Sequence, residues 1–177
     1  SAGICPDGWH VSTDDEWKEL EIFLGMSADD ADATGWRGTD DISNALKEAG
    51  TEHWDAPNLG NNSSGFTALP GGERGGSTGN DDFLGLRANF WATRKYSTGE
   101  IARAVRFIHN NQVGINRGTS YSKQYGYYVR CVEDDGYGCT DMSACNYNSD
   151  ATVDDGSCTN AAENFTCDGI FKPESKA

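Results

Sequence analysis

Residues 5–25 of the chain read CPDGWHVSTDDEWKELEIFLG, and this stretch sets how the fold begins. The run Trp9 to Val11 is apolar and favours a short strand, and Thr13 with Glu16 three residues later is typical of a capping box that begins a helix. Apolar residues then recur at helical spacing, and glycine is a natural helix stop; these residues are Trp17, Leu20, Phe23, Leu24 and the stop Gly25. We therefore predict a strand that leads into a helix over residues 14–24.

The rest of the large domain predicts one more helix and then a sheet. A short helix is expected over residues 42–49, capped by Asp41 or Ser43, and a buried strand is expected within the glycine-rich loop, at residues 65–70. Strand-like alternation follows at residues 89–93, 101–108, 113–116 and 125–132, and a turn at Asn110 and Asn111 would join two of these strands. This order predicts an α+β fold with two helices and an antiparallel sheet.

Composition divides the chain near residue 135. We expect one domain over residues 1–135 and a small cysteine-rich module over residues 136–177, because the second part has few aliphatic residues and needs covalent staples. The six cysteines form an even set without a zinc or redox pattern: Cys5, Cys131, Cys139, Cys145, Cys158 and Cys167. They predict disulfides in an oxidising, extracellular compartment, and the four tail cysteines allow three pairings.

Charge narrows the range of partners. The net charge of −14 argues against nucleic acid and anionic membranes as partners, and no stretch approaches the ~20 apolar residues that span a bilayer. The charge is uneven: residues 1–86 carry 17 acidic and 4 basic residues, whereas residues 87–130 carry 8 basic and 1 acidic. A basic segment therefore lies within an acidic protein.

Four stretches together resemble the Fibrobacter succinogenes major paralogous domain, in matching order over residues 4–135. They are the opening stretch, SGFTALPGGERG from Ser64, NFWATRKYSTGEIARAVRF from Asn89 and YGYYVRCVED from Tyr125. The resemblance implies a C-type-lectin-like fold, also found in formylglycine-generating enzymes, in which helices pack on a twisted antiparallel sheet and the ends of the domain meet. It also implies a Cys5–Cys131 disulfide, since bridged Cα atoms must lie within ~7 Å.

The tail sequence GCTDMSACNYNSDATVDDGSC, residues 138–158, resembles a repeat of secreted Bacteroidota proteins. Its oxygen-bearing side chains follow the spacing of a calcium loop, and they are Asn146, Asn148, Asp150, Thr152, Asp154 and Asp155. Ala151 replaces the glycine of an EF-hand and Ser157 replaces its glutamate, so an EF-hand is excluded. A cysteine-clamped structural Ca²⁺ site is the prediction, and simple Asn/Asp turn chemistry is the alternative.

Catalysis is not expected. Enzymes of the formylglycine-generating group use a reactive cysteine pair, and no cysteine here matches its position. The chain has three histidines and neither a nucleophile elbow nor an HExxH motif. The acidic pair Asp14 and Asp15 falls in a helix cap, and Asp81 with Asp82 is typical of a solvated loop.

Basic and aromatic residues alternate between positions 87 and 128, and such a set can bind sugar rings, hydroxyls, carboxylates or sulfates. The less motif-bound positions are expected to form an exposed recognition surface: Arg94, Tyr96, His109, Asn110, Asn111, Asn116, Arg117 and Tyr121. Loop residues Trp36 and Trp54 are a second candidate platform. The alternative is that the basic sheet complements the acidic half of the domain, with Trp91 in the core and Arg130 paired internally.

The leading hypothesis is an extracellular, secreted or surface-attached, recognition or adhesion module that binds polysaccharide, anionic polysaccharide included, with the tail as a calcium-stiffened spacer. A second hypothesis is a structural subunit of a filament or adhesin that assembles through protein contacts. A third follows from the resemblance, because related lectin-like folds serve as diversified receptor-binding proteins of retroelements. The late asparagines 110, 111 and 116 are compatible with that role.

Overall fold

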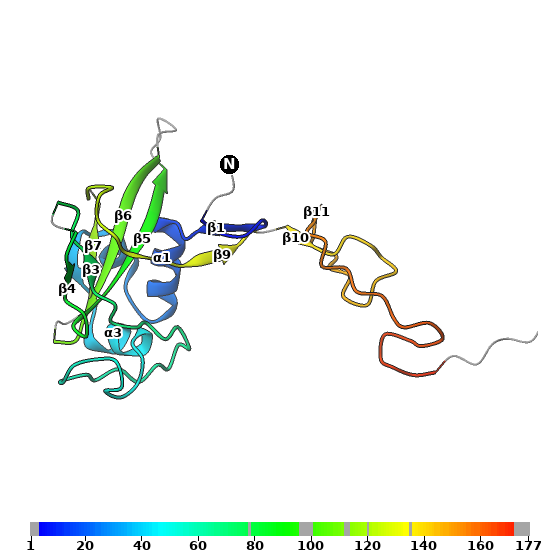
Figure 1. The fold of residues 1–177 in the computed structure, drawn as a ribbon, viewed down its shortest axis with the longest axis horizontal. Helices are drawn as coiled ribbons and strands as arrows, with labels where there is room; N and C mark the ends of the chain where they lie inside the picture. The colour runs from blue at the N-terminus through cyan, green and yellow to red at the C-terminus, as the bar shows by residue number, and fades with distance from the viewer. Residues whose placement is uncertain are drawn as a thin grey trace, which may run out of the picture. The chain divides into compact units, whose positions relative to one another are not determined.

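The structure is a computed structural model that describes residues 4–77, 79–95, 101–111, 114–119, 121–134 and 136–171 (Figure 1). The chain divides into two compact units, one formed by residues 11–130 and the other by residues up to 10 together with residues from 131 onward. Within the described residues, no helix is both long enough and apolar enough to cross a membrane. The architecture is α+β, as predicted.

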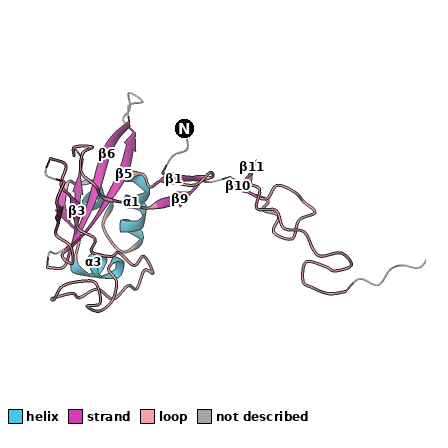
Figure 2. Ribbon diagram, viewed as in Figure 1, coloured by secondary structure: helices cyan, strands magenta, loops and turns pink. Residues whose placement is uncertain are grey.

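A five-stranded sheet forms the centre of the larger unit (Figure 2). Its order is β2 (Gly35–Arg37), β7 (Ile115–Gly118), β6 (Ile101–His109), β5 (Arg87–Lys95) and β8 (Tyr128–Val129). The long strands β5 and β6 confirm the strands predicted at residues 89–93 and 101–108. Neighbours pair antiparallel except β8, which runs parallel to β5. The prediction of a purely antiparallel sheet is therefore wrong at this edge, where a long connection from β7 brings β8 back alongside β5.

Helix α1 (Asp14–Phe23) confirms the predicted first helix and its capping box. The Glu16 amide donates to Thr13 Oγ1 at 3.2 Å, and the Thr13 amide donates to Glu16 Oε2 at 2.7 Å. A short helix that was not predicted, α2 (Ala28–Asp32), follows after the cap residue Ser27. The predicted second helix is present as α3 (Asp40–Leu46), displaced toward Thr39, because Lys47 is already extended.

The hydrophobic core lies between one face of the sheet and the helices. Successive strand residues point to opposite faces, so alternate residues of β5 and β6 supply the core. The buried set includes Ala88, Phe90, Ala92, Ala104, Ile108 and Ile115 from the sheet, and Trp17, Ile42, Leu46 and Trp54 from the helices and loops. In Figure 1, α1 lies on one side of β5 and β6, and the short strands β3 (Glu73–Arg74) and β4 (Asp81–Asp82) lie on the other.

The loop between α3 and β5 contains less strand than expected. Residues 65–70 form no strand, and Ala68 pairs with Lys47 in an isolated bridge. Ala68 is nevertheless fully buried, and its carbonyl accepts a hydrogen bond from Trp54 Nε1 at 3.0 Å. The expected burial is confirmed for Ala68 and Pro70, but Gly65, Thr67 and Leu69 are exposed. The predicted strand conformation is wrong.

The second unit brings together the two ends of the large domain, near residues 5 and 131. Strand β1 (Trp9–Val11) pairs with β9 (Cys131–Glu133), and Cys5 is bonded to Cys131 with a Cα–Cα distance of 5.8 Å. The predicted disulfide is confirmed. It closes a loop of 126 residues, for which chain-entropy estimates give a stabilisation of about 5 kcal/mol.

The tail is held by two further disulfides, Cys139–Cys158 and Cys145–Cys167, which settle the open choice among three pairings. Strand β10 (Tyr137–Gly138) pairs parallel with β11 (Val153–Asp154). Cys139 and Ala144 are the hydrophobic tail residues that are buried among those described. The disulfides thus stabilise the module in place of a large hydrophobic core, as expected for so small a module.

Candidate functional site

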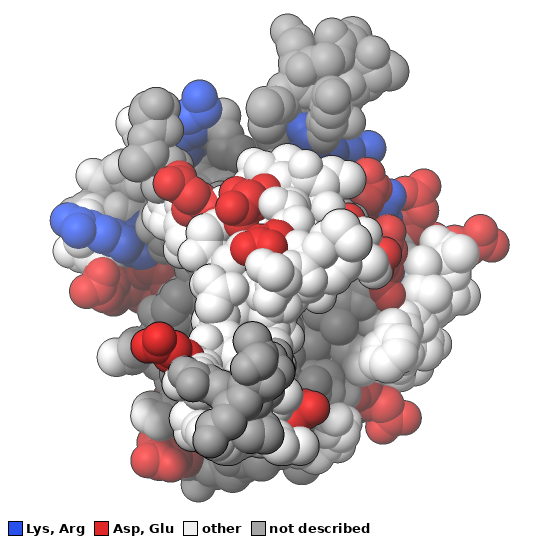
Figure 3. Space-filling view, turned by 90° about the vertical axis from the view of Figure 1, so that its right-hand side faces the viewer, with Lys and Arg blue, Asp and Glu red and all other residues white. Residues whose placement is uncertain are grey.

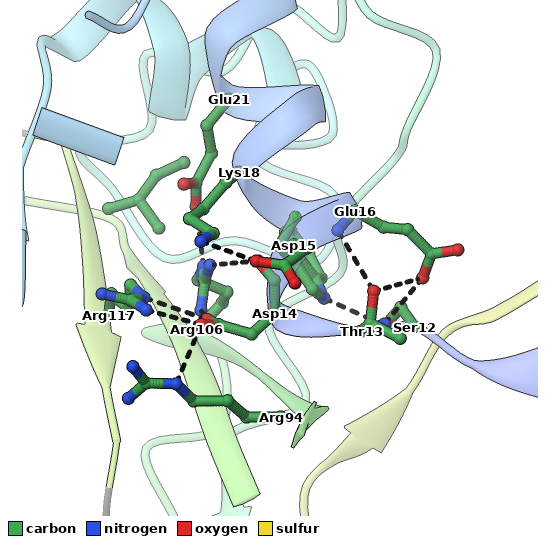
Figure 4. A network of polar contacts seen from close by, with 12 residues as sticks. Ser12, Thr13, Asp14, Asp15, Glu16, Lys18, Glu21, Arg94, Arg106 and Arg117 are labelled. Carbon is green, nitrogen blue, oxygen red and sulfur yellow. Dashed lines mark hydrogen bonds and ion pairs between the residues drawn. The ribbon is translucent and has the colours of Figure 1, made fainter. Parts of the chain in front are cut away.

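The sheet face toward α1, which we call the inner face, carries a buried ion network (Figure 4). Asp14 accepts from Arg106 Nη1 at 2.8 Å and from Arg117 Nη2 at 2.5 Å. Glu21, about two turns further along the same face of α1, accepts from Arg106 Nε at 2.7 Å and from Arg37 Nη2 at 2.6 Å. All five side chains are at most 3% exposed. The network joins α1 to strands β2, β6 and β7.

The arginines set the ionisation of Asp14. Burial alone would raise the pKa of its carboxyl, but hydrogen bonds from Arg117 and Arg106, together with their charges, lower the pKa to about 2. Asp14 is therefore ionised at any ordinary pH. A charged group this deeply buried is strongly destabilising once its partners are removed, so the network is a structural device.

The network corrects part of the predicted recognition surface. Arg117 is 2% exposed and bonded to Asp14, and Arg94 Nε lies 3.8 Å from the same carboxylate. Asn110 is 8% exposed, with Nδ2 donating to the Asp55 carbonyl at 3.4 Å. The predicted exposure of Arg117 and Asn110 is wrong, because strand alternation turns Arg117 inward and the turn folds Asn110 against the neighbouring loop.

The predicted platform at Trp54 is also wrong. This side chain is 1% exposed, donates to a backbone carbonyl and packs in the core. Lys47 Nζ lies 5.8 Å from its ring centroid. Trp54 is therefore a core residue, whereas the paired candidate Trp36 is 42% exposed on the edge strand β2.

The opposite sheet face, the outer face, is built from the other set of alternate strand residues. Register pairs Trp36 with Asn116, Asn116 with Phe107, and Phe107 with Asn89, so one row crosses the sheet from β2 to β5. The adjacent row crosses from Gly118 through Val105 to Trp91. Side chains in these rows face away from α1.

Aromatic rings gather on this face. We call the aromatic cluster the set Trp91, Phe107, Tyr121, Tyr125 and Tyr127. Tyr127 lies at the centre: its ring centroid is 4.7 Å from that of Trp91, 5.7 Å from that of Phe107, and 5.7 Å from that of the stacked Tyr125. Tyr121 remains 37% exposed beside Phe107. The cluster is partly open, so rings stay accessible at its margin.

The outer face brings together four of the sequence-predicted binding residues: Trp36, His109, Asn116 and Tyr121. The Trp36 and His109 rings meet edge to face at 5.1 Å. Burial, reinforced by the nearby Arg87 charge, lowers the pKa of His109 to about 4, so its imidazole is neutral at pH 7. Asn111 is exposed in the turn after β6. Tyr96, the remaining candidate, lies outside the described residues.

A groove adjoins the aromatic cluster and contains residues that were not predicted as a site. It is lined by Gly71, Gly72, Glu73, Arg74, Asp81, Gly126, Tyr127 and Tyr128. Behind it, Asn89 is fully buried and its Nδ2 donates to Glu73 Oε2 at 3.1 Å. The signal for this site in the sequence was the tyrosine repeat YGYY at residues 125–128, in which Tyr127 and Tyr128 line the groove and Tyr125 stacks on Tyr127.

The predicted calcium residues of the tail make contacts within the tail, some local and some between segments distant in sequence. Asn146 Oδ1 accepts from the Thr159 amide at 2.7 Å, and its Nδ2 donates to the Ser157 carbonyl at 2.8 Å. The Oδ1 atoms of Asn148, Asp154 and Asp155 accept from backbone amides two residues later, and Thr152 Oγ1 lies 3.5 Å from the Gly136 carbonyl. The contacts of Asn148, Asp154 and Asp155 are those of the turn alternative, whereas Asn146 and Thr152 join segments distant in sequence.

Within the described ranges, the acid and imidazole group that gathers at metal-binding distances is Glu48, Glu52 and His53. The tail aspartates do not gather in this way. Glu52 and His53 of this group are exposed and Glu48 is half-buried, and His53 Nδ1 bonds to Glu48 Oε1 at 2.9 Å. An exposed acidic group with an internal hydrogen bond needs no metal to explain it.

Acidic side chains are scattered over the face of the molecule in Figure 3. Together with the net charge of −14, this pattern disfavours polyanions at long range. Two basic residues of segment 87–130, Arg106 and Arg117, do not offset this surface charge, since they neutralise a buried acid. The alternative in which the basic sheet complements the acidic half of the domain therefore describes the inner face.

The protein is thus an α+β domain closed by a disulfide. Its central sheet covers a buried ion network on one face and carries partly open aromatic rings on the other. The Fibrobacter succinogenes major domain matches residues 1–133, and the chain belongs to this family. No curated protein and no solved structure matches the chain.

Proposed function

We propose that the protein is a non-catalytic extracellular recognition module that binds polysaccharide through the outer face of its sheet. The observation that carries the proposal is the aromatic cluster, whose rings pack together yet leave Tyr121 accessible. Sugar rings present apolar faces that stack on such side chains. Polar groups for sugar hydroxyls lie in the same rows, among them Asn116 next to Phe107 and Trp36.

The fold is proposed to be C-type-lectin-like. Two features support this proposal: helices pack on one face of the central sheet, and the ends of the family region are joined by β1 with β9 and by the Cys5–Cys131 disulfide. The three disulfides likewise support an extracellular location, since disulfides persist in oxidising compartments.

Affinity electrophoresis through gels that contain neutral, amino and acidic polysaccharides tests the function. We expect the native chain to be retarded by at least one polysaccharide, and the variants Tyr121→Ala and Tyr125→Ala to lose about tenfold in affinity. Tyr147→Ala is the matched control, because Tyr147 is 41% exposed in the tail. Migration unchanged by every polysaccharide contradicts the proposal.

A second function, assembly into a filament or adhesin, is favoured by exposed apolar side chains that do not belong to the aromatic cluster. Phe23 at the end of α1 is 84% exposed, and Phe171 of the tail is 60% exposed. Light scattering of the purified protein distinguishes the two functions. Concentration-dependent assembly that Phe23→Ser abolishes supports the filament, and a strict monomer contradicts it.

Calcium binding by the tail is retained as a proposal about the segment 146–155. Its support is the ligand spacing and the two disulfides that clamp the loop, and a carboxylate that accepts a hydrogen bond through one oxygen can coordinate through the other. Titration calorimetry with Ca²⁺ tests it. We expect binding that the double variant Asp154→Asn, Asp155→Asn removes, and an absence of heat at millimolar Ca²⁺ contradicts the site.

A further inference from the structure

The groove beside the aromatic cluster is lined by two tyrosines and two acidic residues. Tyr127 and Tyr128 line it on one side, and Glu73 and Asp81 come from the paired strands β3 and β4. A hypothetical Cβ at Gly71 would lie 1.8 Å from the Tyr128 hydroxyl oxygen, so the absence of a side chain at Gly71 lets this hydroxyl lie against the backbone there. Tyrosine and carboxylate residues thus line one groove, and the Tyr128 ring also packs against the core residue Phe90, with ring centroids 5.6 Å apart.

Glu73 is held in place from behind. Asn89 is 0% exposed and donates to Glu73 Oε2, while its own Oδ1 has no hydrogen-bond partner among the described residues. A buried polar atom without a partner costs free energy, and such atoms are rare in folded proteins. Asn89 Oδ1 can therefore accept one more hydrogen bond, and because Asn89 is fully buried, a water that bridges to a ligand hydroxyl is the donor that fits.

The charges around Glu73 disfavour an acidic ligand. Register places Asp82 opposite Glu73, and Asp81 opposite Arg74. Burial raises the pKa of Glu73 and so does Asp82, with Arg87 acting against them. A further negative charge in the groove would add to the repulsion that Asp82 already exerts on Glu73.

Two basic side chains nearby lie over aromatic rings, although Arg87 Nε is buried with no hydrogen-bond partner among the described residues. The Arg87 guanidinium lies 3.4 Å from the Phe83 ring centroid, and that of Arg130 lies 4.2 Å from the Phe66 ring centroid, with Nη2 donating to the Phe66 carbonyl. Arg74 also lines the groove, where its single positive charge is outnumbered by the carboxylates of Glu73 and Asp81. Lys123 is exposed on the segment that precedes the tyrosines.

We infer that the groove selects a saccharide without acidic groups, either neutral or amino, with Glu73 and Asp81 accepting from its hydroxyl or ammonium groups while Tyr127 and Tyr128 contact its ring. This inference rests on the proposed polysaccharide function and names the ligand class for it. It also takes the place of the expectation that the ligand is an anionic polysaccharide. The arginines expected to bind such a ligand, Arg94 and Arg117, lie close to Asp14 on the inner face.

Affinity electrophoresis of the full chain on matched gels tests the ligand class, with a neutral glucan, mannan and galactan, the amino polysaccharide chitosan, and the acidic alginate and pectate. We expect retention on a neutral or amino polysaccharide, and affinity at least tenfold weaker for every acidic one. Glu73→Gln should weaken the preferred polysaccharide about tenfold, since one charge-assisted hydrogen bond is lost. Asp81→Asn should weaken it less, because Asp81 is exposed.

Glu19→Gln is the matched control, because Glu19 is an exposed acid on α1 and is not among the residues that line the groove. Thermal melting of each variant shows whether it remains folded, and Asp81→Asn keeps the test informative should Glu73→Gln unfold. Preferred retention on alginate or pectate that Tyr125→Ala still reduces overturns the ligand class and leaves the proposed function standing. Retention on none of the gels overturns both.

Discussion

The two faces of the five-stranded sheet are made by alternate residues of the same strands, yet they use side chains in opposite ways. On the inner face, Arg106 and Arg117 are buried and neutralise Asp14. On the outer face, their strand neighbours Phe107 and Asn116 stand beside aromatic rings, and several rings stay open to solvent. A segment that is both basic and aromatic in sequence is thus separated by alternation into a structural face and a surface face.

The largest expected effect on stability comes from removing the negative charge at the centre of the inner face. In Asp14→Asn, Arg106 and Arg117 stay buried without the carboxylate they share, and we expect the free energy of unfolding to fall by about 3–5 kcal/mol. Urea unfolding measures this. Asp15→Asn is the control, because Asp15 is 82% exposed and its bond to Lys18 is a surface pair. Equal losses in the two variants would show that the network is not structural.

His109 gives the outer face a pH dependence of its own. Its folded pKa of about 4 lies below the unfolded value near 6.5, so the unfolded chain binds more protons between these two pH values. Stability should be complete above pH 6.5 and should fall by up to about 3 kcal/mol as pH drops to 4. His109→Gln should flatten this part of a stability–pH profile. An unchanged profile in the variant contradicts the burial of a neutral imidazole.

Asp14 gives the inner face a separate and more acidic dependence. Its folded pKa of about 2 lies below the ordinary value of 3.8, so the stability it contributes is present above pH 4 and is lost as pH falls toward 2. The loss should be about 2 kcal/mol. Denaturant unfolding at pH 4, 3 and 2 measures it, and Asp14→Asn should lack this dependence. Loss of stability only above pH 4 would argue against ion pairing at Asp14.

The smallest expected effect concerns the edge of the outer face. In Trp36→Ala, we expect polysaccharide affinity to fall about threefold, and the free energy of unfolding to change by less than about 1 kcal/mol. Trp9→Ala is a closely matched control, since Trp36 is 42% and Trp9 43% exposed. Similar losses of affinity in both variants would place the binding surface away from the sheet.

Features encoded by neighbouring residues could be predicted from the sequence. The capping box at Thr13 and the helix after it are local, and the strands at residues 89–93 and 101–108 follow from alternation. The Cys5–Cys131 bridge was implied by family resemblance, because no local pattern brings together residues that far apart.

Strand alternation in the sequence was enough to predict that Arg106 and Arg117 point inward. Arg106 stands two residues before the buried Ile108, and Arg117 two residues after the buried Ile115, so alternation places each on the apolar face. Which acids meet them depends on how α1 crosses the sheet, and that required the tertiary structure. The burial of Trp54 and the groove at Glu73 likewise depend on the path of the long loop between α3 and β5.

The disulfide pattern determines where a single peptide-bond cleavage can release a fragment. The Cys139–Cys158 and Cys145–Cys167 bridges interleave, so any one cut between Cys139 and Cys167 is spanned by at least one of them. The Cys5–Cys131 bridge does the same for the large domain. Between Cys5 and Cys167, the stretch from residue 131 to residue 139 is therefore the one place where a protease can shed the tail with a single cut, while a nick elsewhere leaves both pieces covalently joined.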